Sequence, residues 1–211
     1  MEEERGVTMT EHPIIFTAES IRAILDDRKT QTRRVAKLPS EWHRGYGAFE
    51  NNPHGDEEII IYGECGTKSM YCPYGSVGDT LWVRETWRME TFTVDHTCRT
   101  DSRLRYKAED ERIFDVYGQV KLYKWKSPIH MPKQFARVFL EITGIRVERV
   151  QDISEEDAKA EGVGRFEGRD TYSYAVTFSS LWNSLNAKRG YPWESNPWNW
   201  VIEFKKKEVK Q

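Results

Sequence analysis

The residues best suited to chemistry lie in one short basic segment. Five cations fall within ten residues, and two threonines and a glutamine stand between them. Lys and Arg side chains contact phosphate groups, while hydroxyl and amide groups supply directional hydrogen bonds, so this composition is typical of a nucleic-acid contact. A solvated turn is the alternative, because runs of charge are commonly exposed. The segment contains Arg28, Lys29, Thr30, Gln31, Thr32, Arg33, Arg34 and Lys37.

A second candidate constellation consists of Cys65, Cys72, His96 and Cys98. These residue types can form a Cys3His zinc site, but structural zinc sites favour a Cys-x(2–4)-Cys spacing that aims both thiolates at one ion. Neither pair here has that spacing, so ordinary reduced thiols are favoured over a metal site. We therefore expect no metal and no other cofactor.

The overall composition excludes several classes of protein. The 211 residues include 32 Lys plus Arg and 34 Asp plus Glu, and the resulting net charge of −2 means that any nucleic-acid site must be a local patch. An aromatic content of 13% is too high for a disordered chain. No apolar stretch approaches the roughly 18 residues of a transmembrane helix, and the acidic start is unlike a secretory signal. We expect a cytoplasmic protein without a membrane partner, and the sequence leaves its oligomeric state open.

The elements that must position the basic segment lie on both sides of it. Before it, the pattern predicts a strand and a helix that Thr17 or Ser20 can cap. After it, strands are followed by two helices and a closing strand, an order typical of an α+β fold with a mixed or antiparallel sheet curled into a small barrel. The predicted strands are 13–16, 59–62, 81–85, 103–107, 136–143 and 198–204; residues 29–35 are predicted as a turn into a strand, and 145–150 continue past Gly144 as a bent strand or a hairpin. The predicted helices are 17–25, 153–162 and 174–185.

One domain is expected over residues 13–204, between a polar leader of residues 1–12 and a charged tail of residues 205–211. Two stretches, 36–75 and 88–130, are long for loops, and long loops inside a compact domain are commonly functional or insertions. The last helix carries an apolar stripe that we expect to face the core, formed by Val176, Phe178, Leu181, Trp182 and Leu185.

Residues 24–34, Ile-Leu-Asp-Asp-Arg-Lys-Thr-Gln-Thr-Arg-Arg, resemble the opening signature of the ASCH domain, a PUA-like β-barrel family. In that family a short helix is followed by a basic segment that lines a cleft. Three later segments are similar to the family in the same order: the Gly-Asp turn with its strand at 77–83, a strand at 139–143 and the closing strand at 200–204. Asp27 departs from the pattern, because many members have glycine there.

Other segments resemble, more narrowly, the long ASCH-type proteins of tailed phages and prophages. They are Trp87, the proline-flanked stretch 127–132 and the helix start 153–158. Relative to the minimal domain, the stretches 36–75 and 88–130 are insertions. The resemblance implies an ASCH fold, a PUA-like small β-barrel with flanking helices.

The first function that the resemblance implies is binding of RNA, DNA or a modified nucleoside in the basic cleft. PUA-like barrels hold RNA or a flipped base there, and flipped bases are held by stacking on aromatic rings and by hydrogen bonds to their edges. Trp82, Trp87, Tyr106 and Trp125 are candidate stacking residues, although a core position is the alternative for any one of them. The predicted binding residues are Arg28, Arg33, Arg34, Trp82, Arg84, Glu85 and Trp87.

The second function is hydrolysis of the amide of N4-acetylcytidine-like nucleosides, the reaction of small ASCH proteins. The resemblance implies Lys29, Thr32 and Glu141 as the catalytic residues. Threonine is a weak nucleophile and needs a base, and a lysine can serve only if burial or a neighbouring cation lowers its pKa. Lys29 and Thr32 can converge only on a bent backbone, since they would point to opposite faces of a straight strand. The alternative roles are a phosphate contact for Lys29, a hydroxyl on the strand face for Thr32, and an ion pair with Arg33 or Arg34 for Glu141.

A ribonuclease is the third possibility that the family allows. Lys29, Glu141 and a metal could suffice for it, but the sequence shows no clustered acids of the kind that hold two metal ions. Glu85 is a further acid that could pair with Arg33 or face the cleft. Binding is the favoured reading, with the amidohydrolase as the first alternative.

Overall fold

The computed structural model shows a five-stranded mixed sheet at the centre of the molecule. Its strands are β1 (Glu11–Ile15), β2 (Gln31–Val35), β6 (Thr80–Arg84), β9 (Phe139–Arg149) and β10 (Trp198–Lys206), in the order β1-β6-β9-β10-β2. The first pair is parallel and the other neighbours are antiparallel. The structure describes residues 9–37, 48–51, 58–63, 66–93, 100–109, 124–164 and 173–208.

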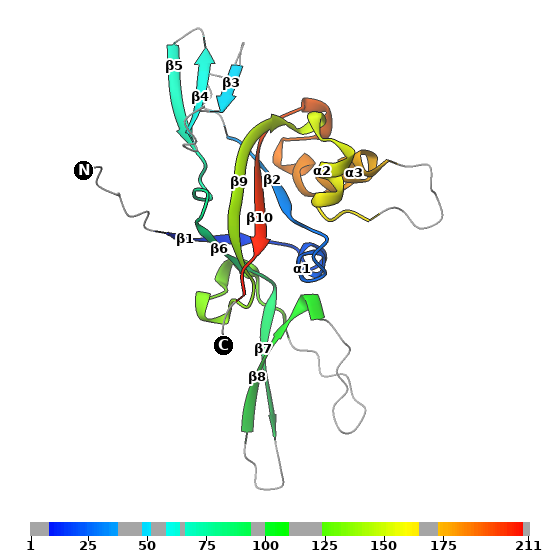
Figure 1. Cartoon of the computed structure of the whole chain (residues 1–211). Helices are drawn as coiled ribbons and strands as arrows, with labels where there is room; N and C mark the ends of the chain where they lie inside the picture. The colour runs from blue at the N-terminus through cyan, green and yellow to red at the C-terminus, as the bar shows by residue number, and fades with distance from the viewer. Residues whose placement is uncertain are drawn as a thin grey trace, which may run out of the picture.

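Two further β-structures project from opposite ends of this body (Figure 1). A three-stranded antiparallel sheet falls in the first predicted insertion and a two-stranded antiparallel ribbon in the second. Sequence patterning predicted only one strand in each of them. The strands are β3 (Ala48–Asn51), β4 (Glu58–Gly63) and β5 (Gly66–Tyr71) in the sheet, and β7 (Trp87–Thr93) and β8 (Thr100–Tyr106) in the ribbon.

In the described part of the chain, three α-helices accompany the central sheet: α1 (Ala18–Leu25), α2 (Glu155–Ala160) and α3 (Tyr174–Asn186). Each begins after a hydroxyl residue whose side chain accepts a hydrogen bond from a backbone N–H of the first turn, as an N-cap should. Short 3-10 turns connect the remaining elements. Helices α2 and α3 lie together on the side of β2 (Figure 1). The predicted α+β class is confirmed.

The turn after α1 explains the departure at Asp27. This residue has a φ of 56°, in the left-handed region that glycine occupies without strain and that Asp tolerates better than most residues. The turn therefore keeps a left-handed residue at the position where many ASCH proteins have glycine. It directs Arg28 and Lys29 back toward the helix, and both of their backbone N–H groups donate to the carbonyl oxygen of Ala23.

The main core lies on one face of the central sheet. Cross-strand partners such as Leu81 and Leu140, and Ile145 and Ile202, pack there with Ile21 and Ile24 of α1. Strand β9 bends as predicted near Gly144, where the register with β10 shifts between Glu203 and Phe204. A smaller core under α2 and α3 is formed by Val150, Ile153, Ala158, Phe178 and Trp182.

The central sheet is curled, because its two edge strands approach each other. Arg34 on β2 donates a hydrogen bond from Nη2 to the carbonyl oxygen of Ile15 at the end of β1, at 2.6 Å. This side-chain contact bridges the two edges, and a pocket opens beside it. Among the described residues, no helix is long and apolar enough to span a membrane.

Candidate functional site

A pocket of about 850 Å³ lies along the free edge of β2. One wall is the junction of β1 and α1, from Ile15 to Ser20, and the opposite wall is α3 with the turn that follows it. The volume is in the range of pockets that hold small organic ligands. Six cations and two carboxylates are among its lining residues: Lys29, Arg33, Arg34, Lys37, Lys107 and Arg189 against Glu19 and Glu161.

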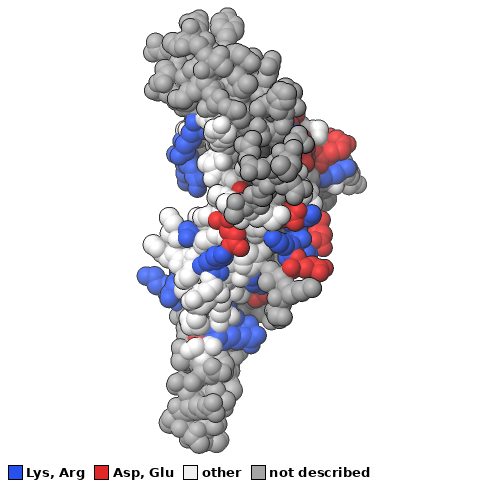
Figure 2. Space-filling model, turned by 60° about the vertical axis from the view of Figure 1, so that its left-hand side comes forward, with Lys and Arg blue, Asp and Glu red and all other residues white. Residues whose placement is uncertain are grey.

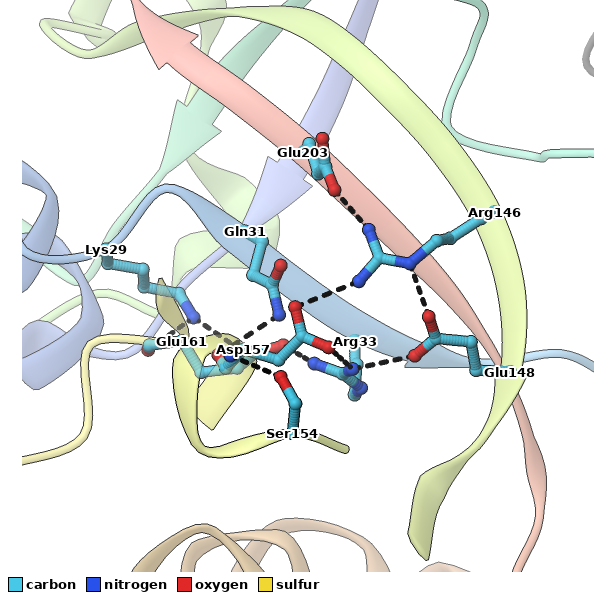
Figure 3. A network of polar contacts seen from close by, with 9 residues as sticks. All are labelled: Lys29, Gln31, Arg33, Arg146, Glu148, Ser154, Asp157, Glu161 and Glu203. Atoms are coloured by element: carbon cyan, nitrogen blue, oxygen red, sulfur yellow. Dashed lines mark hydrogen bonds and ion pairs between the residues drawn. The ribbon is translucent and has the colours of Figure 1, made fainter. Parts of the chain in front are cut away.

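Lys29 is at the centre of the site and is 5% exposed. Its ammonium donates to a carboxylate oxygen of Glu161 at 2.7 Å and to the carbonyl oxygen of the same residue at 2.8 Å (Figure 3). Burial lowers the pKa of Lys29 below its usual value; Glu161 opposes this effect, and Arg34 and Arg33 add to it. The result is a buried ammonium with a lowered pKa beside one carboxylate.

Close packing at the end of α2 positions Glu161. Gly162 follows it with a φ of 78°, and a Cβ atom there would lie 2.7 Å from Cβ of Lys29 and 2.9 Å from Cβ of Ala23. Only a residue without a side chain fits this conformation and this space. Because the chain can approach so closely, Lys29 and Glu161 form a β-bridge and Thr30 N–H donates to the carbonyl oxygen of Ala160.

Arg33 belongs to a charge network on the other side of Glu161. Its guanidinium pairs with Glu148 at 2.8 Å, Asp157 at 3.0 Å and Glu161 at 3.5 Å, and none of its side chain is exposed. Arg146 joins the same network through Asp157 and Glu148, and also contacts Glu203 (Figure 3). The guanidinium predicted to touch nucleic acid is therefore enclosed by carboxylates of the chain itself.

Asp157, like Glu148, contacts both Arg33 and Arg146. Partial burial by itself raises the pKa of Asp157, but the two guanidinium groups outweigh burial and hold this pKa below its ordinary value. Gln31 also reaches this residue and donates to its carbonyl oxygen at 3.1 Å. The network thus ties β2, β9 and α2 together.

Thr32 and Arg34 point into the pocket from the face of β2 that carries the main core. Their cross-strand partners are Ile202 and Trp200 of that core. Arg34 lies over the ring of Phe16 with 5.1 Å between guanidinium carbon and ring centre. In the described part of the chain, the Thr32 hydroxyl has no hydrogen-bond partner, although the residue is buried and lines the pocket.

Lys29 and Thr32 both line the pocket. Lys29 precedes β2, which begins at Gln31, and forms the bridge with Glu161. Lys29 and Arg33 both contact Glu161, whereas Thr32 is paired with Ile202 of the main core, so the bent backbone that a shared catalytic role requires stays a prediction.

Glu141 does not share this pocket, and the expectation that it does is wrong. It pairs across the sheet with Lys205, whose side chain projects to the face opposite that of Ile202 and Phe204 because successive residues of a strand alternate. Thr32 is paired with Ile202 and therefore lies on the other face. The carboxylate of Glu141 forms a partly exposed ion pair with Lys205 at 2.8 Å.

The predicted binding residues of β6 and its continuation are also absent from the pocket lining. Trp82 is buried, with Arg84 stacked on its ring at 4.6 Å. Glu85 is almost fully buried and receives two hydrogen bonds from Arg137 rather than from Arg33. Burial raises the pKa of Glu85 against the effect of Arg137. Trp87 packs on Phe135 in the core position that was its alternative.

Three other candidates have defined surroundings outside the pocket. Arg28 is exposed and pairs with Asp26 at 2.9 Å. Tyr106 donates to the carbonyl oxygen of Phe135, and Trp125 lies under the guanidinium of Arg88 at 4.1 Å. None of the three lines the pocket at β2, so the structure does not bring them to Lys29.

The stripe of α3 is divided between core and pocket. Phe178 and Trp182 are buried as predicted, but Leu181 and Leu185 are 37% and 42% exposed and Val176 is 46% exposed. Leu181 and Leu185 line the pocket together with the two aromatic residues. The expectation that the whole stripe faces the core is wrong for these three residues, because Leu181 and Leu185 border the pocket and Val176 is exposed.

The expectation that the cysteines are ordinary reduced thiols stays a prediction. Cys65, His96 and Cys98 lie outside the described residues, and Cys72 is buried. Within the described ranges, no group of three His, Cys, Asp or Glu residues is placed to hold a metal ion.

The residue that sequence analysis missed is Glu161. One signal could have indicated it: a carboxylate at the C-terminal end of a helix is disfavoured by the helix dipole unless a cation neutralises it. Glu161 directly follows α2 and is followed by a glycine. Its partner was hidden because Lys29 is 132 residues away in the sequence.

No protein-family model and no curated protein matches the sequence. Among solved structures, the chain is similar to the high-resolution crystal structure of an ASCH domain from Lactobacillus crispatus JV V101. The identity is 12% and the TM-score 0.39, over 93% of this chain and 79% of that chain. A likeness of this degree assigns neither an activity nor a ligand.

Proposed function

We propose that the chain binds a nucleobase or a nucleic-acid strand in the pocket beside β2. The observation that carries this function is the composition of the pocket, in which cations outnumber carboxylates and aromatic rings lie among them. Cations attract phosphate groups, and aromatic rings provide surfaces on which bases stack. The aromatic lining residues are Phe16, Tyr74, Phe178, Trp182 and Tyr191.

The available charge comes from the pocket cations that no carboxylate neutralises. Among the described residues, Arg34, Lys37, Lys107 and Arg189 have no ion-pair partner, whereas Lys29 and Arg33 are paired with Glu161. Outside the pocket, basic and acidic residues are interspersed over the face shown in Figure 2. A local patch agrees with the net charge of −2. The resemblance of residues 24–34 to the ASCH family agrees with this proposal, and it also supports a PUA-like barrel.

Two neighbouring cations of the turn after α3 allow a matched test. Arg189 lines the pocket, whereas Lys188 is exposed beside it and does not. We expect Arg189→Ala to weaken binding of labelled single-stranded RNA or DNA about tenfold at low salt, and Lys188→Ala to change it less than twofold. Fluorescence anisotropy measures both. Absence of saturable binding by the wild type to either polymer, or equal losses in the two variants, contradicts the proposal.

A second candidate function is hydrolysis of an N4-acetylcytidine-like amide, with Glu161 in place of Glu141. The observation that favours it is a Thr32 hydroxyl, without a partner among the described residues, in the same pocket as the Lys29–Glu161 pair. A proton shift within that pair leaves an amine to accept the Thr32 proton and a carboxylic acid to protonate the departing amine. Thr32 Oγ1 then bonds to the acetyl carbon as the C–N bond breaks, and water releases acetate from the threonine.

Substitution of Thr32 separates hydrolysis from binding. If Thr32 is the nucleophile, Thr32→Val abolishes release of cytidine from N4-acetylcytidine, while Thr32→Ser retains part of it. Chromatography of the products measures the rate. If the wild-type protein binds nucleotides without releasing cytidine, only the binding function is supported. Equal turnover by the wild type and Thr32→Val contradicts the catalytic role of this hydroxyl.

A further inference from the structure

The contribution of Arg33 to the pocket comes from its backbone. The residue is 5% exposed as a whole, yet its side chain is 0% exposed, so its accessible surface belongs to the main chain. Arg33 nevertheless lines the pocket. The ligand space therefore meets peptide groups of β2 at this position, while the guanidinium is enclosed by Glu148, Asp157 and Glu161.

The hydrogen bonds between β2 and β10 determine where these peptide groups point. Phe204 N–H donates to the carbonyl oxygen of Thr30, and Ala36 N–H donates to the carbonyl oxygen of Trp198. In an antiparallel pair, hydrogen-bonded positions alternate with positions whose N–H and C=O point away from the partner strand. Even-numbered residues of β2 thus bond to β10. The N–H and C=O of Arg33 point outward, toward the pocket.

This free edge is short. Thr30 N–H, at its beginning, is already bonded to the carbonyl oxygen of Ala160. Within the described part of the chain, the outward groups of Gln31, Arg33 and Val35 have no backbone partner, and of these residues Arg33 and Val35 line the pocket. A peptide that extends the sheet would pair along the whole edge, whereas only two residues of the edge meet the ligand space. One planar ring, in contrast, needs only one or two peptide groups.

We propose that the outward N–H and C=O of Arg33 bind the hydrogen-bonding edge of a single nucleobase. The inference rests on the proposed function and adds how that site recognises its ligand. Every base carries a donor and an acceptor side by side on its Watson–Crick edge, and these match the N–H and C=O of one extended residue. The Thr32 hydroxyl lies beside this pair, and Arg34 and Arg189 line the same pocket for the phosphate.

Amide hydrogen exchange measured by NMR tests the arrangement directly. In the free protein, the N–H of Arg33 should exchange at least tenfold faster than those of Thr32 and Arg34, which are bonded to β10. Saturation with the best-binding nucleoside 5′-monophosphate or labelled RNA should slow the exchange of the Arg33 N–H at least tenfold and leave the exchange rates of Thr32 and Arg34 unchanged. Protection of Arg33 equal to that of Thr32 in the free protein overturns the inference without any ligand.

A backbone substitution at Arg33 provides the second test. Replacing the residue by its α-hydroxy acid counterpart removes the N–H and keeps the guanidinium in its network. We expect at least a fivefold loss of nucleotide affinity, against no loss for the same replacement at Lys188. If the protein binds nucleotides but the exchange of the Arg33 N–H does not slow, and the protein with the α-hydroxy acid at position 33 binds as tightly as the wild type, the inference is overturned and the proposed function stays intact. Absence of binding by any nucleotide or RNA refutes the proposed function as well, and protection of the whole edge by an extended peptide points to a protein partner instead.

Discussion

Two groups of cations meet at β2, and they differ in what neutralises them. Lys29, Arg33 and Arg146 are held by carboxylates of the chain in a partly buried network, whereas Arg34 and Arg189 have no carboxylate partner among the described residues. Lys29, Arg33 and Arg34 come from one basic segment of the sequence. Neighbouring cations of a basic run can thus serve different purposes: those that meet buried acids hold the fold, and those that do not remain available for an anionic ligand.

Removing one acid of the network gives the largest expected effect. Glu161→Ala leaves the buried Lys29 ammonium without its partner, and breaking a buried pair in this way costs about 3–5 kcal/mol of stability. Urea denaturation at pH 7 measures the loss. Glu156→Ala, an exposed position of α2, is the control and should stay within about 0.5 kcal/mol of the wild type. Equal effects of the two substitutions contradict the structural role of the network.

Salt should separate the two groups of cations in one protein. Raising NaCl from 0.1 to 1 M shortens the Debye length from about 10 Å to about 3 Å, which screens accessible charges far more than buried pairs. RNA affinity is expected to fall at least tenfold, while the urea midpoint changes little. The comparison fails if the midpoint falls steeply with salt and the affinity does not.

The loss of folding stability at acidic pH should depend on Asp157. Its folded-state pKa lies below the ordinary value, so its contribution to stability is complete above the unfolded pKa of about 3.9 and is lost as the pH falls through the lower folded pKa. Asp157→Asn should therefore flatten the fall in stability below about pH 4. Denaturation curves between pH 2.5 and 7 measure it, and an unchanged slope contradicts the assignment.

The smallest effect is expected at Glu141. Its ion pair with Lys205 is partly exposed, and pairs of this kind contribute about 0–1 kcal/mol. Glu141→Gln should change stability by less than about 1 kcal/mol and leave nucleotide affinity within twofold of the wild type. A loss of affinity like that of Arg189→Ala would place Glu141 in the site after all.

Local patterns in the sequence predicted the elements but not the partners of their residues. The cap of α1, the strand at β6 and the curvature of β9 are local signals, and the structure confirms them. The alternation expected for β6 does not appear as a difference in burial, because Leu81, Trp82 and Val83 are all buried. Strands β3, β5 and β7 were not predicted. Strand β3 has only four residues, β5 is polar and begins with a glycine, and β7 carries an alternation from Trp87 to Glu90 that could have indicated it. Glu141 was misplaced because register, rather than residue type, decides which face of a sheet a side chain takes.

The arrangement of the site could not be predicted from any short stretch of the sequence. The link from Lys29 to Glu161 spans 132 residues, and only packing at Gly162 shows why those two chain segments meet. The outward direction of the Arg33 peptide groups depends on the parity of hydrogen bonds to β10. By contrast, the basic segment could be chosen as a candidate from its local charge and from the resemblance of residues 24–34 to the ASCH family, and four of its cations do line the pocket.

The position of β2 in the sheet has a consequence for how the molecule is assembled during synthesis. Among the described strands, β2 hydrogen-bonds only to β10, which is the last one to leave the ribosome. Until then the basic segment has no neighbour in the sheet, and pairing over so long a separation in sequence is slow. The strand pairing beside the pocket therefore cannot form before β10 has been synthesised, and a nascent chain that lacks β10 has no finished ligand site to occupy.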